Sequence, residues 1–503
     1  MNLYKQNNII VTPLGFLHNI LYTTLSGLME GAKDLTGNYN RIHFIGIGGT
    51  GMSGIAKILM NMGYNVSGSD LKVSEALIRL RDAGANVFIG HHVSNVIGAD
   101  LVVVSSAIPK TNPEYVKAIE SNIPVVHRAD MLSLLMDSKK GVAVSGAHGK
   151  TTTTSMISLI MEKNGFDPTV IIGGELNDIG GNATLGSGEF LVAEADESDG
   201  SFVKLKPYIA VITNIENDHM DYYKNMENMK RAFKEFAGNV IEDGFIVLGN
   251  DNEHVRELEK DIDKEFYTFG INHNSDFMPK NIRLEGLSTR FEIYFRGKLL
   301  GEMQLNVPGI HNIVNATAAI AVGNRLGISI EGMREAIKTF RGVQRRFQIV
   351  GDIDGIKVID DYAHHPTEIK ATLRAAKNCR PRKVYAIFQP HRYTRTQNLS
   401  KEFGSSFFDA DEIVLTDIYS AGETPIKGVS SDLIAEYLRE NGKKVVYIKR
   451  KEEIPDYIID KKLVPGDYIL TIGAGDISDV AYSIVSKLKS RQKGVIGNIP
   501  EVK

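Results

Sequence analysis

Cysteine, net charge and unbroken apolar runs are all scarce in this sequence. Its 503 residues include one cysteine, Cys379, which excludes an intramolecular disulfide framework and a zinc or iron–sulfur site built from several cysteines. That scarcity fits a reducing compartment. The 58 basic and 61 acidic side chains leave a net charge of −3, so there is no electrostatic reason to expect a nucleic-acid partner.

The most apolar stretch lies near the N-terminus, at residues 9–29, and proline, glycine and polar residues interrupt it. A membrane-spanning helix needs about 20 mostly apolar residues, so we expect no stable membrane insertion. A secretory signal would have a stronger basic start and a small-residue cleavage site. We interpret residues 1–40 as an extension before the first domain, with Met29 as a candidate for the natural start.

The length is too great for one ordinary core, and two to four domains are expected. Strand and helix patterns alternate along the chain, which predicts doubly wound α/β units. The run at 101–106 (LVVVSS) is typical of a parallel strand buried on both faces. We predict domains at 41–138, 139–342 and 343–490, and a tail at 491–503.

A glycine-rich turn, Gly46-x-Gly-x-x-Gly51, lies between an expected strand and an expected helix. Glycines let the backbone approach a diphosphate, and the start of the helix supplies N–H donors. Asp70 ends the next strand, where its carboxylate can bond a ribose or a base. The pattern favours a nucleotide diphosphate over a purely structural turn, but it does not single out nicotinamide.

A second glycine pattern, Gly146-x-x-Gly149-Lys150-Thr151, follows a buried-type strand and precedes a threonine-rich helix. It is shorter than the usual phosphate loop, yet its parts match the same chemistry. Backbone N–H groups suit phosphate oxygens, Lys150 suits the β- and γ-phosphates, and the Thr151 hydroxyl suits Mg²⁺. The context favours nucleoside triphosphate binding over a chance Gly-Lys-Thr.

Acidic and imidazole side chains follow two further strands of this second domain. Glu194 comes directly after the strand at 190–193, and His219 comes shortly after the strand at 209–213. Such strand ends are where a hard cation binds. A solvated acidic loop is the alternative for Glu194. For His219 on its own, a structural histidine is favoured over a Mg²⁺ or Mn²⁺ ligand.

The third domain carries two loops rich in histidine and arginine, each after a strand. They are DDYAHHP at 360–366 and QPHRYTR at 389–395, and Arg345-Arg346 lies at the domain junction. Loops at neighbouring strand ends favour a mouth that binds carboxylates and phosphates over two solvated basic loops. Together with the triphosphate site, this mouth predicts an ATP-driven condensation.

From about Arg41 to its end the chain resembles the Mur ligase family. The resemblance rests on these words, in order: GIGGTGMSG, SGSD, VVVSSAI, HRADML, SGAHGKTTTT, EADESDGSF, TNIENDHMDYY, PGIHNIVNA, GVQRRF, DDYAHHPTE, FQPHRYTRT, IYSAGETP and GAGDI. It implies a cytoplasmic enzyme of peptidoglycan synthesis. The implied fold has an N-terminal Rossmann-like UDP-binding domain, a central P-loop ATPase-type domain and a C-terminal Rossmann-like domain.

The resemblance also implies the reaction and its cofactors. L-alanine would be joined to the lactyl carboxylate of UDP-N-acetylmuramate while ATP is hydrolysed to ADP and phosphate, with Mg²⁺ or Mn²⁺ bound. Monomer and homodimer both stay open.

The resemblance assigns roles to the residues that match the family's motifs. The UDP-sugar would contact Gly46, Gly48, Gly49, Gly51, Ser53, Asp70, Ser105, Ser106 and Arg128. ATP would contact Gly146, Ala147, His148, Gly149, Lys150, Thr151, Thr152, Asn312, Asn315, Arg346 and Asp361. The amino acid would contact Tyr362, His364, His391, Arg392 and Arg395. The metal ligands would be Thr151, Glu194 and His219, and the catalytic residues Lys150, Glu194, His219 and His364.

Two residues depart from the family pattern. Ala147 stands where Thr or Ser is usual, and Ala363 replaces a frequent Gly. Three alternatives remain beside the single-alanine reaction: a cell-wall recycling ligase that attaches a peptide to the same UDP-sugar, a nicotinamide oxidoreductase, and an inactive homologue. The words HHPTE and HRYTRT favour the single amino acid. The argument against an inactive protein is that four residues are intact: Lys150, Thr151, Glu194 and His219.

Overall fold

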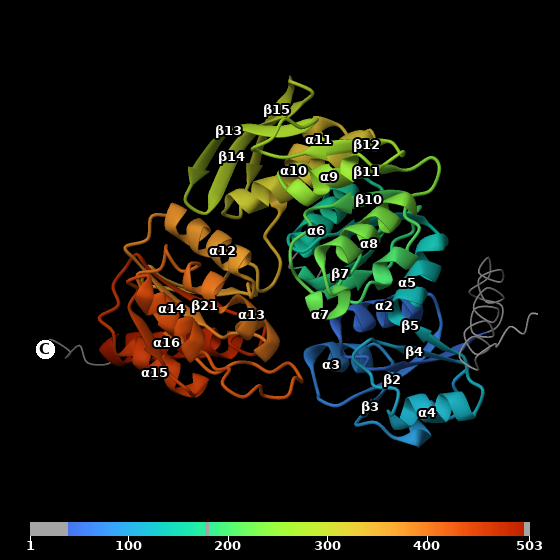
Figure 1. Cartoon of the computed structure of the whole chain (residues 1–503), viewed down its shortest axis with the longest axis horizontal. Coiled ribbons are helices and arrows are strands. Elements are labelled where there is room, and N and C mark those ends of the chain that lie inside the picture. The colour runs from blue at the N-terminus through green and yellow to red at the C-terminus, as the bar shows by residue number, and fades with distance from the viewer. Residues whose placement is uncertain (1–38, 177–180, 497–503) are drawn as a thin grey trace, which may run out of the picture.

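The computed structural model describes residues 39–176 and 181–496, and these form three sheets that follow one another along the chain (Figure 1). Residues 1–38 of the expected extension, and with them the candidate start at Met29, lie outside the described residues. In Figure 1 the N-terminal domain runs from blue to cyan, the middle domain from teal to yellow, and the C-terminal domain from orange to red. Among the described helices, none combines the length and apolar character needed to cross a membrane.

The N-terminal domain is a parallel five-stranded sheet in the order β3-β2-β1-β4-β5. The order reverses direction beside β1, so the carboxyl ends of β1 and β4 form the edge where ligands bind in such sheets. Its elements are β1 (Arg41–Ile45), α2 (Thr50–Asn61), β2 (Asn65–Asp70), α3 (Glu75–Asp82), β3 (Asn86–Ile89), β4 (Leu101–Val104), α4 (Pro113–Glu120), β5 (Val125–His127) and α5 (Arg128–Asp137).

The middle domain is built on a ten-stranded sheet in the order β15-β14-β13-β12-β11-β10-β6-β9-β7-β8. Its strands are β6 (Lys140–Ser145), β7 (Thr169–Leu176), β8 (Gly181–Thr184), β9 (Phe190–Glu194), β10 (Ile209–Ile212), β11 (Phe245–Gly249), β12 (Phe266–Phe269), β13 (Phe277–Glu285), β14 (Ser288–Phe295) and β15 (Lys298–Leu305). Its helices are α6 (Lys150–Lys163), α7 (Met220–Tyr223), α8 (Met226–Gly238), α9 (Glu253–Glu259), α10 (Ile310–Arg325) and α11 (Ile330–Thr339).

The C-terminal domain is a six-stranded sheet in the order β16-β17-β21-β18-β19-β20, and only the pairing of β16 with β17 is antiparallel within it. Its strands are β16 (Gln348–Ile353), β17 (Ile356–Asp361), β18 (Lys383–Phe388), β19 (Glu412–Leu415), β20 (Val445–Tyr447) and β21 (Asp467–Ile472). Its helices are α12 (Pro366–Asn378), α13 (Tyr393–Gly404), α14 (Asp432–Glu440), α15 (Ile454–Ile459) and α16 (Ser478–Ile496).

The predicted fold of three α/β domains is confirmed, with two local differences. The middle sheet is mixed, because β8 pairs antiparallel with β7. At its other edge β13, β14 and β15 form an antiparallel meander that the sequence analysis did not predict. These strands alternate partly buried and exposed residues, which gives no continuous apolar run to recognise. Helix α16 also continues to Ile496, past the expected end of the domain at 490.

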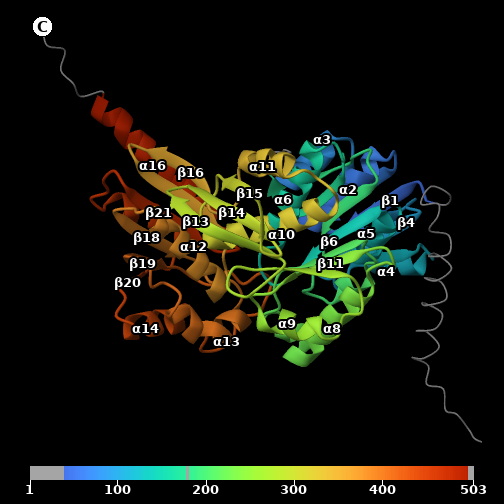
Figure 2. The ribbon, with the colours of Figure 1, turned by 90° about the horizontal axis from the view of Figure 1, so that it is seen from above.

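The first two domains share a core, whereas the third has its own. One apolar cluster joins Ile55 and Leu59 of α2 to Ile171 and Ala183 on β7 and β8. The buried residues of the C-terminal clusters all come from residues 347–488, and Leu287 of the middle domain packs against the edge of one of them. Figures 1 and 2 both show this domain beside the other two, with α12 next to α10. Separate cores make the C-terminal domain the part that can move as a unit.

Candidate active site

The first glycine turn follows β1, and Asp70 holds it from the end of β2. Gly46 has a φ of +83°, which glycine adopts without strain, and the Gly48 amide donates to Asp70 Oδ2 at 2.9 Å. Ser105 lies beside Gly46, since its hydroxyl would be 3.6 Å from a Cβ there. The turn, Asp70 and Ser105 therefore meet at one sheet edge, and the exposed Ser106 follows directly.

Arg128 reaches the same turn from the start of α5. Its guanidinium lies against Gly51, where a Cβ would come within 3.0 Å of Nη1, and it bonds Asp196 of the middle domain at 3.1 Å. Ser53, in contrast, is only 2% exposed and accepts a bond from the Asn182 side chain at 2.9 Å. In this structure the Ser53 hydroxyl serves the packing of α2 on the middle domain.

The phosphate loop connects β6 to α6, and two glycines give it its shape. Gly146 and Gly149 have φ values of +133° and +84°. The Ala147 amide donates to the Asn214 carbonyl at 3.2 Å, and the His148 amide donates to Asn214 Oδ1 at 2.9 Å. Asn214 thus accepts hydrogen bonds from two backbone amides that the sequence analysis expected to donate to phosphate.

Lys150, the first residue of α6, lies in a buried ion pair. Its Nζ is 2.7 Å from Glu197 Oε1 and donates to the Gly146 carbonyl at 2.6 Å. Burial lowers the pKa of Lys150, but Glu197 and Asp196 outweigh that effect and raise it above the ordinary value. The side chain therefore stays cationic at the mouth of the loop.

The three predicted metal ligands lie near this lysine. The Thr151 hydroxyl donates to Glu194 Oε1 at 2.8 Å, and His219 Nε2 is 3.7 Å from Glu197 Oε1. Glu197 Oε2 is buried and has no hydrogen-bond partner among the described residues. A hydroxyl, an imidazole and two carboxylates, one with an unpaired oxygen, form a donor set that fits Mg²⁺ or Mn²⁺.

A cavity of about 480 Å³ opens between the middle and C-terminal domains beside the loop. His148, Gly149 and Thr151 line one side of it. Its other walls include predicted ATP contacts from α10 and from the third domain, namely Asn312, Asn315, Arg346 and Asp361. The structure therefore brings residues from three separate segments to one cavity, whereas Lys150 lies outside its lining.

The histidine and arginine loops of the third domain face the middle domain. The rings of His364 and His391 are 5.7 Å apart, and Arg395 contacts His391 Nδ1 at 3.2 Å and Asp218 Oδ1 at 3.1 Å. Arg346 stacks over Tyr362, with 5.2 Å from its guanidinium to the ring centre. Arg392, in the second loop, directly precedes α13; it has a φ of +71° and lies 3.9 Å from a Glu423 oxygen.

Both histidines of this mouth are uncharged at neutral pH. Burial lowers the pKa of His364 to about 4, and burial together with His364 and Arg395 lowers that of His391 to about 3. His364 Nδ1 lies 3.0 Å from the Tyr362 carbonyl and 3.4 Å from Glu368 Oε2. Both neighbours are acceptors, so Nδ1 carries the proton and Nε2 presents a lone pair.

Three family models match the chain domain by domain. They are the Mur ligase family catalytic domain at residues 41–140, the Mur ligase middle domain at 144–323 and the Mur ligase glutamate ligase domain at 345–475. A UDP-N-acetylmuramate–L-alanine ligase of Pelotomaculum thermopropionicum is 53% identical over 454 residues, which are 90% of this chain and 98% of that protein. The chain belongs to the Mur ligase family.

Other Mur ligases agree with this placement. The ligase of the same name from Geotalea daltonii is 49% identical over 90% of this chain and 99% of its own. The crystal structure of a Thermotoga maritima UDP-N-acetylmuramate–alanine ligase has a TM-score of 0.78 at 32% identity, over 90% of this chain and 99% of that one. A murein peptide ligase from Psychrobacter arcticus, 24% identical with a TM-score of 0.67 over 89% and 98%, shares the fold.

The structure of this Mur ligase identifies glutamates to which the sequence analysis assigned no role. Glu197 is 2% exposed and pairs with Lys150, although it lies in an acidic run that also reads as a solvated loop. Glu216 and Glu368 lie on either side of His148. Glu368 could have been found from its spacing, because a polar side chain followed three residues later by Glu marks the start of a helix. The structure shows that box, with His365 as its first member.

Proposed function

We propose that this chain joins L-alanine to the lactyl carboxylate of UDP-N-acetylmuramate, with ATP as the source of energy, in the synthesis of peptidoglycan precursors. The observation that carries the proposal is the position of the phosphate loop. It opens on a cavity whose opposite wall belongs to the domain with the His/Arg mouth. The ligase name printed for relatives about half identical over nine-tenths of the chain supports the same reaction.

In this proposal each domain holds one substrate. The UDP-sugar lies on the first glycine turn with Asp70, Ser105 and Arg128. ATP fills the interdomain cavity, with Asn312 and Asn315 toward the adenine and Lys150 toward the terminal phosphates. Thr151, Glu194 and His219 would hold Mg²⁺ or Mn²⁺, which neutralises charge on the transferring phosphoryl group. We further propose a cytoplasmic enzyme and the domain limits 41–138, 139–342 and 343–490, with the last turns of α16 extending from the third domain into the tail.

A carboxylate is a poor electrophile, so the acid of the sugar must first be activated. The lactyl carboxylate attacks the γ-phosphorus of ATP, which gives an acyl phosphate and ADP. The amine of alanine then attacks the acyl carbon, and phosphate leaves from the tetrahedral intermediate. Lys150 stabilises the charge on the phosphoryl oxygens, and no protein nucleophile is required.

The third domain would receive the alanine. Arg395 and Arg392 would hold its carboxylate, since guanidinium and carboxylate form paired hydrogen bonds. Because Nε2 of His364 presents a lone pair, that ring is the candidate acceptor for the amine proton. Closure of the C-terminal domain brings this mouth to the acyl phosphate.

The test is Lys150→Ala, with Lys163→Ala as the matched control, since Lys163 is an exposed lysine at the other end of α6. We expect Lys150→Ala to abolish phosphate release while binding of UDP-N-acetylmuramate stays unchanged, and the control to behave as the parent. Ligation at a near-parent rate in Lys150→Ala would show that the phosphate-loop assignment is wrong. Supplying a peptide in place of alanine tests the recycling ligase as the alternative.

A further inference from the structure

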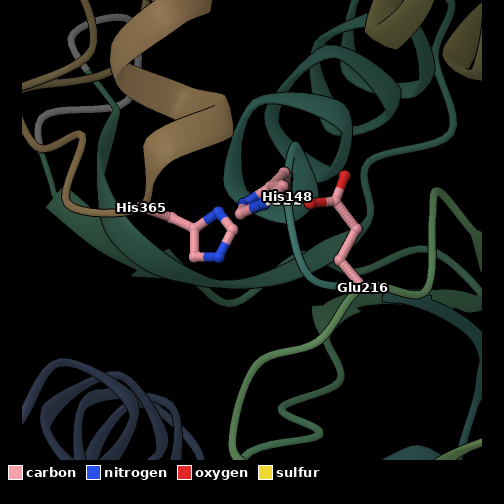
Figure 3. A group of neighbouring side chains, drawn as sticks. All are labelled: His148, Glu216 and His365. Atoms are coloured by element: carbon pink, nitrogen blue, oxygen red, sulfur yellow. Dashed lines mark hydrogen bonds and ion pairs between the residues drawn. The ribbon is translucent and has the colours of Figure 1, made fainter. Parts of the chain in front are cut away.

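A polar cluster links the phosphate loop to the C-terminal domain and has no part in the mechanism above. Figure 3 shows the ring of His148 between Glu216 and His365. His148 belongs to the loop before α6 and Glu216 follows β10, so both come from the middle domain. His365 caps the start of α12, and Glu368 lies in the first turn of that helix. The cluster therefore crosses the domain boundary beside the cavity.

His148 holds one carboxylate from each domain. Its Nδ1 is 3.2 Å from Glu368 Oε1, and its Nε2 is 3.2 Å from Glu216 Oε2. Thr367 of α12 also donates its hydroxyl to Glu216 Oε2, at 3.0 Å. Burial lowers the pKa of His148, but the two carboxylates outweigh it and raise the pKa to about 10. His148 is therefore an imidazolium at neutral pH, and both of its N–H groups donate.

The two carboxylate oxygens of Glu368 contact two different loops. Oε1 faces His148 and lies 3.7 Å from Arg346, on the side of the ATP cavity. Oε2 accepts the amides of His364 at 2.9 Å and His365 at 3.2 Å. The same oxygen is 3.4 Å from His364 Nδ1, so it also helps to fix the proton on that nitrogen. The Glu368 carboxylate, on a side chain that is 12% exposed, thus contacts both the phosphate loop and the amino-acid loop.

A bound cation is the competing explanation for this cluster. Ligand atoms of His148, Glu216 and His365 lie within 4.8 Å of one another, and His365 Nε2 is buried without a partner among the described residues. Both nitrogens of His148, however, already face carboxylates at hydrogen-bond distance. A proton on each nitrogen satisfies the ring completely, so the ion pairs account for His148 without a metal.

We propose that Glu368 is a positioning residue that couples the phosphate loop to the amino-acid mouth through His148. This inference rests on the proposed function, because that function assigns ATP to the phosphate loop and alanine to the amino-acid mouth. When the C-terminal domain closes, His148 donates to Glu368 Oε1 and fixes the position of that carboxylate. Oε2 is then aligned to hold the backbone of His364 and the orientation of its ring. Alanine consequently meets an ordered mouth only when the phosphate loop is in place.

The experiment compares Glu368→Gln, His148→Gln and the double variant, with Glu331→Gln as the control. Glu331 is an exposed glutamate in the first turn of α11, a matched helix position away from the site. Steady-state phosphate release gives kcat and the KM for alanine separately. We expect each single variant to raise the alanine KM about tenfold or more, as the loss of a charged hydrogen bond does. The double variant is expected to be no worse than the more affected single variant.

Two outcomes would overturn the coupling. One is an unchanged alanine KM in Glu368→Gln, and the other is a double variant whose losses multiply as independent effects. Stoichiometric zinc in the purified parent, measured by elemental analysis, would overturn the ion-pair explanation. Thermal unfolding separates a folding defect from a positioning one, and His148→Gln tests the same link from the other domain. A parent that does not ligate alanine refutes the proposed function, whereas an active parent with a silent Glu368→Gln refutes only this inference.

Discussion

Gly146→Ala is the change that tests the shape of the phosphate loop most sharply. Gly146 has a φ of +133°, a conformation that residues with a Cβ rarely adopt. A Cβ there would lie 2.2 Å from Thr213 Oγ1 and 2.8 Å from the Asn214 carbonyl oxygen. Neither group can yield freely, because Thr213 Oγ1 donates to the His148 carbonyl at 2.7 Å and Asn214 holds the amides of the loop.

The expected cost follows from these contacts. Backbone strain of this kind costs about 1–3 kcal/mol, and each hydrogen bond lost as Asn214 is displaced costs about 1 kcal/mol more. We therefore expect Gly146→Ala to destabilise the protein by about 3–5 kcal/mol. Gly165→Ala is the matched control, since Gly165 has a φ of +82° but nothing within 4 Å of its Cβ position. Its cost is the strain alone, about 1–2 kcal/mol.

Urea unfolding and ATP binding give the comparison. The midpoint of Gly146→Ala should fall well below that of Gly165→Ala, and its ATP affinity should be lost because the loop can no longer approach the phosphates. Gly165→Ala should bind ATP as the parent does. Equal midpoints together with equal ATP affinity in the two variants would refute the argument that Asn214 and the loop are locked together.

Two further predictions concern acid stability and the metal. Glu114 is fully buried and accepts from Asn95 and from the His92 amide. Burial raises its pKa, but bonds from His43, Ser69 and Asn95 outweigh this and lower it from 4.5 to about 2. Its stabilisation is therefore present above pH 4.5 and is lost as pH falls from 4.5 through 2. Urea unfolding between pH 6 and pH 3 covers the first part of this titration, so Glu114→Gln should lose about 2 kcal/mol less than the parent over that range. Dialysis against EDTA should abolish phosphate release and leave UDP-sugar binding intact. Addition of Mg²⁺ or Mn²⁺ should restore the activity. Activity that survives complete metal removal would contradict the assignment of Thr151, Glu194 and His219 as metal ligands.

Local patterns were enough to predict the parts of the fold that depend on neighbouring residues. β1 and the glycine turn, β6 and the phosphate loop, and β10 with His219 behind it are contiguous units, and each is read from one short stretch. The strands predicted at 190–193 and 209–213 are observed as β9 (Phe190–Glu194) and β10 (Ile209–Ile212), because a short apolar run between polar segments has few other solutions.

Contacts between distant segments could not be predicted in the same way. The partners of His148 are Glu216 and Glu368, which lie 68 and 220 residues away in the chain. The spacing of Glu368 from His365 marks the start of a helix, but no local pattern shows that Glu216 or Glu368 contacts the phosphate loop. The same holds for Glu197, whose burial against Lys150 depends on how β9 and α6 pack.

Transfer of an isotopic oxygen tests the central claim most directly. UDP-N-acetylmuramate labelled with ¹⁸O in both oxygens of its lactyl carboxylate is incubated with ATP, L-alanine and the enzyme, and the released phosphate is analysed by mass. If the sugar's acid attacks the terminal phosphorus of ATP, each phosphate leaves with one labelled oxygen and the other stays in the new amide. Unlabelled phosphate formed in step with the amide product would contradict the acyl phosphate and with it the proposed use of the site.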